Sequence, residues 1–435
     1  MLGRPDRLLL ERCMRNPTRK RQTPRSNPHR GRSLSKSSAR TSIPSGPLSG
    51  IRILDLTRLL PGGYCTQMLA DLGAEVIKIE QPGAGDYWRH VGLRVREQSC
   101  QFLALNRGKK SITLDLKHPD GREAFLRLCE TADVVVEGFR PGVMTRLKLD
   151  ASALHARNPR LVICAITGFG QDGPWAQLAA HDLNYLGLTG VLHYANGTAT
   201  RPRATALPIG DVGAGGLMAV NGILAGLLEC SRTGKGRSID VSVADGLFSW
   251  VSFMTARWNV PGHADVDVPF DAPFDKPFYS VYETKDGRHL VTGAYEPKFW
   301  KTLCEVLQIE EWVDRQWADG AEEDELRRLL ASKFAAKPLA EWMEIFAIHE
   351  ACVTPVLTIK EALETTHAVA RGTVVTVEDP AEGKLREIAC PLRFDGVTFG
   401  SRTPAPSLGQ DSDSLLREVG YGARDIQKMK SSGAV

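Results

Sequence analysis

Two side chains of opposite acid–base character, His181 and Asp211, stand in the stretch from Pro174 to Glu229. His181 lies between a run of small residues and a segment with helical apolar spacing. Asp211 opens a glycine-rich segment that continues as an apolar helix. A histidine and a carboxylate that face one substrate can remove a proton from carbon and return it. The sequence therefore suggests a proton-transfer site at the starts of two helices.

Each of these residues also has a structural interpretation. Asp211 is a natural N-cap, and His181 could be a hydrogen-bonded histidine at a helix entrance capped by Asp182. Glu296 could simply begin a helix, where the dipole favours its charge. In favour of chemistry at Asp211, the preceding apolar residues would raise its pKa. Three glycines would also let a ligand approach the backbone, where N–H groups can bind an oxyanion: Gly213, Gly215 and Gly216.

The elements that must position these groups begin near Gly50. Residues 51–56 and 74–80 have the β-branched composition of buried strands, with a short helix between them. Further strands are expected at 111–116, 133–139, 161–170 and 238–245, with a crossover helix at 118–132. This alternation predicts a doubly wound parallel sheet, whose ligands bind beyond the carboxyl ends of its strands. The turn after residue 56 lacks the G-x-G-x-x-G pattern, which disfavours NAD and FAD.

Cations gather in the loops near those strand ends. Taken singly, each is typical of a solvated surface charge, but together on one edge of a sheet they favour a phosphate-bearing ligand. They are Arg107, Lys109, Lys110, Lys117, Arg140 and Arg146.

The pattern changes near residue 250. A Pro- and Asp-rich connection leads to a hairpin at 278–295, followed by helical patterns that indicate a small α+β domain. Short strands and a final amphipathic helix then return to the first domain. We expect a large domain of residues 48–245 and 375–435, and a small domain of residues 246–374.

Residues 1–47 form a basic leader, with ten arginines and two lysines against Asp6 and Glu11. This Ser-, Pro- and Arg-rich segment has no apolar periodicity, so we expect it to be disordered. A mitochondrial transit peptide, an over-called start codon and an idle extension all fit it. It contains no aromatic residue, which speaks against nucleic-acid binding.

The rest of the composition narrows the function classes. The chain is 42% hydrophobic and 24% charged, and no apolar run approaches eighteen residues, so we expect no membrane span. The nine cysteines are scattered without a C-x-x-C pair, which indicates reduced thiols in a cytoplasmic compartment and no metal site.

From about Leu48 to its last helix, the chain resembles the class III CoA-transferase superfamily (CaiB/BaiF type), and within it the α-methylacyl-CoA racemase branch. The match recurs in order over eight segments. They are LADLGAEVIKIE, LNRGKKSITLDLK, VVVEGFRPGVM, ITGFGQDGPWAQLAAHDLNYLGLTGVL, GDVGAGGLMAVNGILAGLLE, TGKGRSIDVSVADG, YETKDGRHLVTGAYEPKFW and ACVTPVLT.

The resemblance implies an α/β fold with a Rossmann-like large domain, a smaller α+β domain and an interlocked homodimer. It implies catalytic roles for His181 and Asp211, with Glu296 orienting the histidine from the partner chain. The coenzyme A of the substrate would bind on the large domain, with no separate cofactor. Its expected contacts are Arg107, Lys109, Lys117, Arg140 and Arg146, with the adenine near Gly138.

The expected activity is racemisation of 2-methylacyl-CoA thioesters in fatty acid metabolism, through an enolate. The alternative is a CoA-transferase that uses Asp211 as nucleophile and does not need His181. Gln81 stands where mammalian-type racemases have an arginine, which is the transferase pattern. A third reading is an acyl-CoA-binding protein without catalysis.

Overall fold

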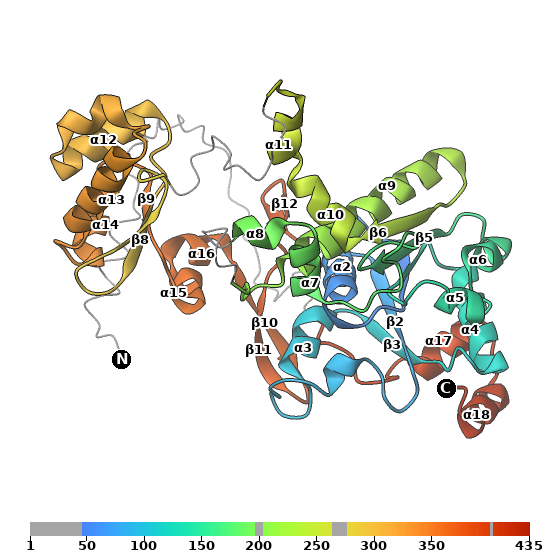
Figure 1. Cartoon of the computed structure of the whole chain (residues 1–435). Helices are drawn as coiled ribbons and strands as arrows, with labels where there is room; N and C mark the ends of the chain where they lie inside the picture. Colours follow the sequence, from blue (N-terminus) through green and yellow to red (C-terminus); the bar gives the residue numbers. More distant parts are fainter. Residues whose placement is uncertain (1–45, 196–202, 263–275, 401–402) are drawn as a thin grey trace, which may run out of the picture. The chain divides into compact units, whose positions relative to one another are not determined.

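The computed structural model describes residues 46–195, 203–262, 276–400 and 403–435 (Figure 1). The chain divides into a large unit, Ser42–Ala264 with Val375–Val435, and a small unit, Asp265–Val374. Apart from Gly46 and Pro47, the leader expected at residues 1–47 lies outside the described residues.

A six-stranded parallel sheet forms the centre of the large unit, in the order β3-β2-β1-β4-β5-β6. This is the strand order of a Rossmann-type sheet, so the predicted α/β fold is confirmed. Between β1 and β4 the order of the strands reverses, and such a switch point is where ligands bind. The strands are β1 (Arg52–Asp55), β2 (Glu75–Glu80), β3 (Lys110–Thr113), β4 (Val134–Glu137), β5 (Val162–Thr167) and β6 (Ser238–Ser242).

Helices cover both faces of this sheet. Leu54 and its neighbours on one face pack in a core with residues of α4 (Pro119–Glu130), α6 (Ala151–Arg157), α17 (Ser412–Glu418) and α18 (Ala423–Ser431). Ile53 points to the opposite face, against α2 (Leu59–Asp71) and α9 (Met218–Thr233). Because both faces are buried, the strands are almost continuously apolar, as expected for a parallel sheet.

Four helical segments beside the sheet position the candidate site. They are α7 (Asp182–Leu188), the π-helical segment η2 (Gly210–Leu217), its continuation α9, and α10 (Val243–Trp250). Within the described residues, Gly210–Thr233 is long and apolar enough to cross a membrane, a test that a core helix also passes. Its contacts with α2, β5 and β6 make it part of the large unit.

The chain returns to the large unit after residue 374. The ribbon β10 (Val374–Asp379) and β11 (Gly383–Ile388) is followed by the two-residue strands β12 (Arg393–Phe394) and β13 (Val397–Thr398). Glu387 of β11 pairs with Arg107, which follows α3 (Cys100–Asn106). Asp411 accepts a hydrogen bond from the N–H of Ser111 in β3 at 2.9 Å. Residues far apart in the sequence therefore complete the sheet edge.

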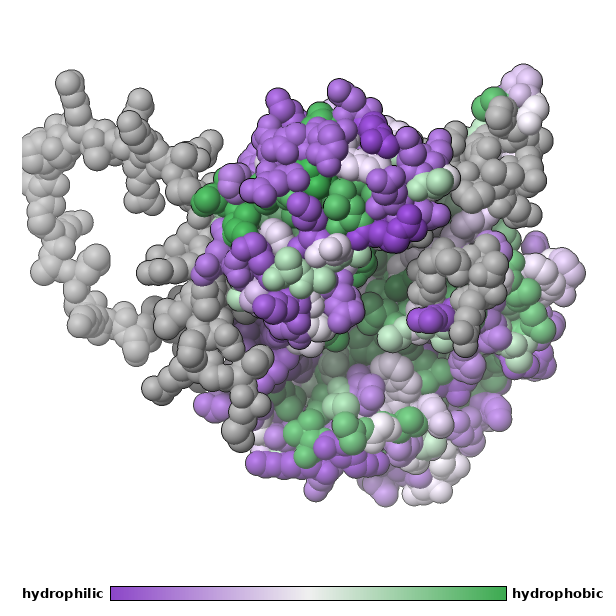
Figure 2. All heavy atoms as spheres, turned by 60° about the vertical axis from the view of Figure 1, so that its left-hand side comes forward, coloured by the Kyte–Doolittle hydropathy of each residue, from purple (hydrophilic) through white to green (hydrophobic). Residues whose placement is uncertain are grey.

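The small unit contains the antiparallel sheet β7-β8-β9 and a group of helices. Its strands are β7 (Val281–Glu283), β8 (His289–Thr292) and β9 (Val353–Pro355). The helices are α12 (Pro297–Leu307), η4 (Glu310–Arg315), α13 (Ala321–Phe334), α14 (Leu339–Phe346), α15 (Ile359–Glu364) and α16 (Thr366–Arg371). Its core centres on Trp300, Phe334 and Trp342. Hydrophobic residues are scattered among polar ones over the face shown in Figure 2.

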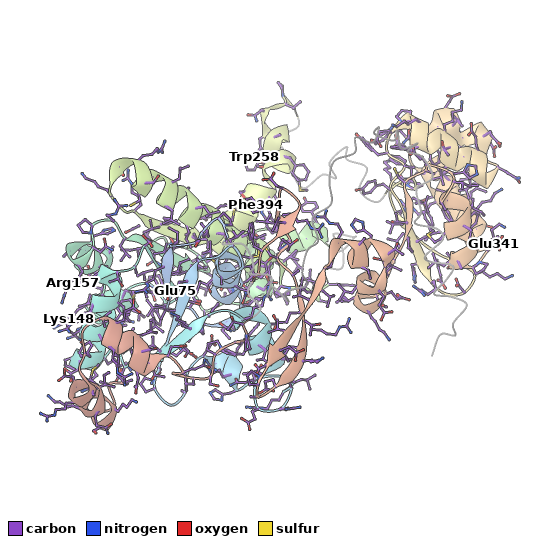
Figure 3. The ribbon with its side chains drawn as sticks, turned by 180° about the vertical axis from the view of Figure 1, so that it is seen from behind. Glu75, Lys148, Arg157, Trp258, Glu341 and Phe394 are labelled. Atoms are coloured by element: carbon purple, nitrogen blue, oxygen red, sulfur yellow. The ribbon has the colours of Figure 1, made fainter. Side chains whose placement is uncertain are left out.

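The segment after β6 forms three short helices: α10, α11 (Ser252–Thr255) and η3 (Ala256–Asn259). The first begins inside the strand expected at 238–245, because the Ser242 hydroxyl accepts from the N–H of Asp245 and ends β6. Helix α10 packs on η2 and β6 and belongs to the large unit. Trp258 of η3 is 59% exposed (Figure 3).

Candidate active site

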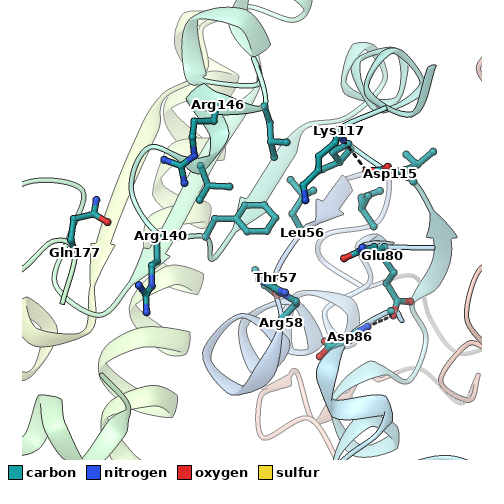
Figure 4. Close-up of a pocket in the computed structure, with 18 residues that line it drawn as sticks. Leu56, Thr57, Arg58, Glu80, Asp86, Asp115, Lys117, Arg140, Arg146 and Gln177 are labelled. Atoms are coloured by element: carbon teal, nitrogen blue, oxygen red, sulfur yellow. Dashed lines mark hydrogen bonds between the residues drawn. The ribbon is translucent and has the colours of Figure 1, made fainter. Parts of the chain in front are cut away.

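A cavity of about 590 Å³ lies beyond the carboxyl ends of β1 to β4, at the switch point of the sheet. Figure 4 shows four cations around it: Arg58, Lys117, Arg140 and Arg146. Its apolar wall includes Leu56, Ile79, Leu114 and Phe139. Positive charge beside an apolar surface suits a ligand that joins phosphates to an aromatic base.

A second cavity of about 320 Å³ contains the two candidate catalytic side chains, His181 and Asp211. Thr57, Arg58, Phe139 and Arg140 line both cavities. The two spaces are therefore neighbours, and one extended ligand could occupy both.

His181 is the N-cap of α7, with an extended backbone at φ −131° and ψ 176°. Its N–H donates to Oδ1 of Asn184 at 3.0 Å, so Asp182 is not the cap. The Tyr185 hydroxyl donates to the carbonyl of Ala180 at 3.0 Å, which fixes the segment that leads into His181. A Cβ at Gly168 would lie 2.4 Å from the Tyr185 ring, so only glycine fits there. The imidazole remains exposed at the cavity.

Asp211 lies inside the first turn of η2 and is not its N-cap, which corrects the sequence-based expectation. The N-cap is Ile209, whose backbone is already helical. Burial, together with the nearby charge of Asp182, raises the pKa of Asp211 to about 7. A carboxyl group with such a pKa exists in both protonation states near neutral pH, as an acid–base catalyst requires. Short π-helical segments are also frequent at functional sites.

The glycines after Asp211 pack closely against neighbouring helices. A Cβ at Gly213 would lie 2.5 Å from the Trp250 ring of α10, and one at Gly216 would lie 3.0 Å from the Pro61 carbonyl of α2. Neighbouring helices therefore fill the space beside these two glycines. That their N–H groups meet a ligand stays a prediction.

The expected CoA contacts divide into two groups. Lys117, Arg140 and Arg146 line the larger cavity, and Gly138 lines the smaller one together with Arg140. Lys109 is completely buried, with Nζ 2.7 Å from the Thr66 hydroxyl and 3.2 Å from Asp55. Arg107 is buried between Asp71 and Glu387. Phosphate contacts by Arg107 and Lys109 are thus corrected, because both cations are neutralised inside the protein.

Two residues of this region, Arg58 and Tyr185, are absent from the site predicted from the sequence, and Asp182 is considered there only as a helix cap. Arg58 lies in the loop after β1, and a cation just beyond a central strand could have been recognised from the switch-point rule. Its guanidinium lies 5.7 Å from the centre of the Phe139 ring, which follows β4. Asp182 and Tyr185 carry no signal of their own, since any short helix can contain them.

Glu296 lies in the small unit, where it is the N-cap of α12 with an extended backbone. The buried Gln316 side chain donates to the carbonyls of Ala294 and Tyr295 at 3.0 and 2.8 Å, and so fixes the approach to Glu296. Across both units, the described residues contain no cluster of three His, Cys, Asp or Glu side chains that could hold a metal ion.

A model of CoA-transferase family III matches residues 48–412. Alpha-methylacyl-CoA racemase of Homo sapiens is 35% identical over 394 residues, covering 88% of this chain and 96% of that protein. Succinyl-CoA:glutarate CoA-transferase of Mus musculus is 32% identical over 396 residues, covering 89% and 90%. A crystal structure of a CaiB/BaiF family protein from Brucella suis superposes with a TM-score of 0.74 at 28% identity, covering 86% of this chain and all of that one.

Proposed function

The chain belongs to CoA-transferase family III, and within that family we propose that it racemises 2-methylacyl-CoA thioesters by proton transfer through an enolate. One observation carries the proposal: His181 and Asp211 line the same cavity, next to a cation-lined cavity suited to a CoA nucleotide. We further propose that CoA enters only as part of the substrate, and that the protein works in fatty acid metabolism in the cytoplasm as a homodimer.

In this mechanism the thioester acidifies the hydrogen on its α-carbon. The His181 imidazole removes that proton from one face, the electron pair of the C–H bond forms the enolate, and the Asp211 carboxyl group protonates the other face. The roles exchange for the opposite enantiomer, so each group must work as an acid and as a base. The first N–H groups of α7, which follow His181, are suited to hold the enolate oxygen.

The second candidate is CoA transfer to a carboxylic acid, supported by relatives such as the mouse transferase. There the Asp211 carboxylate would attack the thioester carbonyl, expel CoA as a thiolate and form a mixed anhydride. A raised pKa makes a carboxylate more nucleophilic, so Asp211 suits this chemistry as well. His181 would have no part in it, and this difference separates the two activities.

The deciding experiment incubates (R)- and (S)-2-methylacyl-CoA thioesters with the enzyme in deuterated water and follows deuterium at the α-carbon. We expect exchange and racemisation without a carboxylate acceptor, and a loss of about 10²- to 10⁴-fold in His181→Ala. His349→Ala, which changes an exposed histidine of the small unit, is the matched control.

Exchange that persists undiminished in His181→Ala would rule out the proposed mechanism. Hydroxylamine supplies the complementary measurement, because it traps an anhydride or thioester at Asp211 and leaves no adduct after simple proton transfer. A trapped adduct, together with transfer to added carboxylates, would establish the transferase instead.

A further inference from the structure

A hydrogen bond joins α7 to η2 at the candidate site. The N–H of Asp211 donates to Oδ1 of Asp182 at 2.8 Å, across 29 residues of sequence. Asp182 is the first residue of α7, directly after His181. One carboxylate therefore connects the backbone of both candidate catalytic residues.

The geometry of η2 explains why this carboxylate binds there. The first N–H groups of a helix have no acceptor within the helix, and the positive end of the dipole favours an anion. Asp211 is the second residue of η2, and the side chain that caps its N–H comes from another element. A Cβ at Gly210 would lie 3.0 Å from Asp182 Oδ1, so the absence of a side chain at Gly210 permits the close approach.

We propose that Asp182 is a positioning residue, whose carboxylate accepts a hydrogen bond from the Asp211 N–H and so holds Asp211 at the cavity. This inference rests on the proposed racemase function. Nothing in the proton transfer requires the Asp182 side chain to touch the substrate, so the contribution of this carboxylate passes through Asp211.

The electrostatics agree with this geometry. Asp182 is the charge that adds to burial in raising the pKa of Asp211 to about 7. Burial and the charges of Asp211 and Asp182 also raise the pKa of Tyr185 to about 12. The elements packed against η2 carry other titratable groups: Tyr64, Cys65 and Asp71 on α2, Cys164 on β5, Asp240 on β6, Asp245 on α10, and Glu229, Cys230 and Arg232 on α9. None of them contributes to the shift at Asp211.

Two substitutions separate the charge from the hydrogen bond. Asp182→Asn keeps an oxygen that can accept from the Asp211 N–H but removes the charge, so the pKa of Asp211 falls. In the direction where Asp211 is the base, the acid limb of the rate profile moves to lower pH. In the reverse direction Asp211 is the acid, so its pKa sets the alkaline limb of the profile. That limb also moves to lower pH, and we expect each shift to be about one pH unit. Asp182→Ala also removes the hydrogen bond, and we expect a further loss of kcat of about 10- to 100-fold.

The test measures full pH profiles of kcat in both directions for wild type, Asp182→Asn and Asp182→Ala. Asp172→Asn, which removes an exposed charge from the preceding loop, is the matched control and should leave both limbs in place. Limbs that stay at the wild-type pH in Asp182→Asn would overturn the proposal, as would equal kcat values for Asp182→Asn and Asp182→Ala.

A second readout does not depend on activity. The ¹³C carboxyl resonance of Asp211, assigned by its absence in Asp211→Asn, can be titrated in the full chain. We expect its midpoint to fall in Asp182→Asn and to stay unchanged in Asp172→Asn. A wild-type enzyme without racemase activity would refute the proposed function and leave this titration intact, whereas an unchanged midpoint would refute the role of Asp182 alone. Gly210→Ala, which pushes Asp182 away, should shift the midpoint in the same direction.

Discussion

Lys109 and Lys117 show how much the surroundings of a residue decide its role. Lys109 directly precedes β3 and Lys117 lies in the loop after it. Both are cations of the type that binds phosphate. Lys117 lines the larger cavity, whereas Lys109 is buried against Asp55 and Thr66. Burial lowers the pKa of Lys109 to about 8, and its partners keep it charged at neutral pH. The spacing of the two lysines in the sequence contains no sign of this difference.

The two lysines should therefore respond differently to substitution. Lys117→Ala should weaken CoA binding about tenfold, because one charge-assisted contact is lost, and should leave the free energy of unfolding almost unchanged. Lys109→Met should lower the free energy of unfolding by about 3–5 kcal/mol, because it breaks a buried ion pair. Titration calorimetry with CoA and urea denaturation measure the two effects.

Their salt dependence provides the internal control. Affinity that rests on Lys117, Arg140 and Arg146 should fall as salt rises, and less steeply in Lys117→Ala. If folded Lys109→Met lost as much affinity as Lys117→Ala, then Lys109 would belong to the ligand site after all.

At the scale of elements, the strands were the most predictable part. Their apolar runs and β-branched residues identified all six strands of the sheet, because burial on both faces leaves little freedom of composition. The position of Asp211 within η2 was not predictable, since the helix begins before Asp211 and has a π-helical turn. That geometry depends on α2 and α10, which are distant from η2 in the sequence and pack against its glycines.

The contact between η2 and α10 can be tested through its glycines. A Cβ at Gly246 of α10 would lie 2.6 Å from the carbonyl oxygen of Ala214, so Gly246→Ala must separate the two helices. We expect a loss of about 1–3 kcal/mol in the free energy of unfolding, despite the better helix propensity of alanine. Because Asp211 lies on η2, kcat should fall as well.

Gly187→Ala on α7 is the matched control, since no atom lies within 4 Å of its added Cβ. There the helix propensity acts alone, and we expect a gain of about 0.5–1 kcal/mol. Equal effects of the two substitutions in urea denaturation would show that close packing against η2 is unimportant.

At the scale of the whole molecule, the proposed homodimer has a candidate surface on the large unit. Phe248 and Trp250 of α10, Phe253 of α11 and Trp258 of η3 are each more than a third exposed. Such a concentration of large apolar side chains is typical of a surface that a partner covers. The resemblance to interlocked dimers led us to expect that each site takes His181 and Asp211 from one chain and Glu296 from the other.

Complementation tests that arrangement. Inactive His181→Ala and inactive Glu296→Ala proteins, refolded together, should regain roughly a quarter of wild-type activity, because half of the dimers are mixed and each holds one intact site. A mixture of His181→Ala with Asp211→Asn should regain none, since both changes affect the same unit. Mixed dimers can be counted by mass spectrometry, and no recovery in proven mixed dimers would place each site within one chain.

The pairing of Asp411 with Ser111 has a consequence for how the protein is made. During translation, all of Asp265–Val374 emerges before Asp411 and Ser412, which bond to the edge strand β3. The small unit therefore has its complete sequence while the large unit still lacks residues that its sheet edge needs. Because domains fold as their residues become available, we expect the small unit to complete its fold first, while β3 still lacks the residues that bond to its edge.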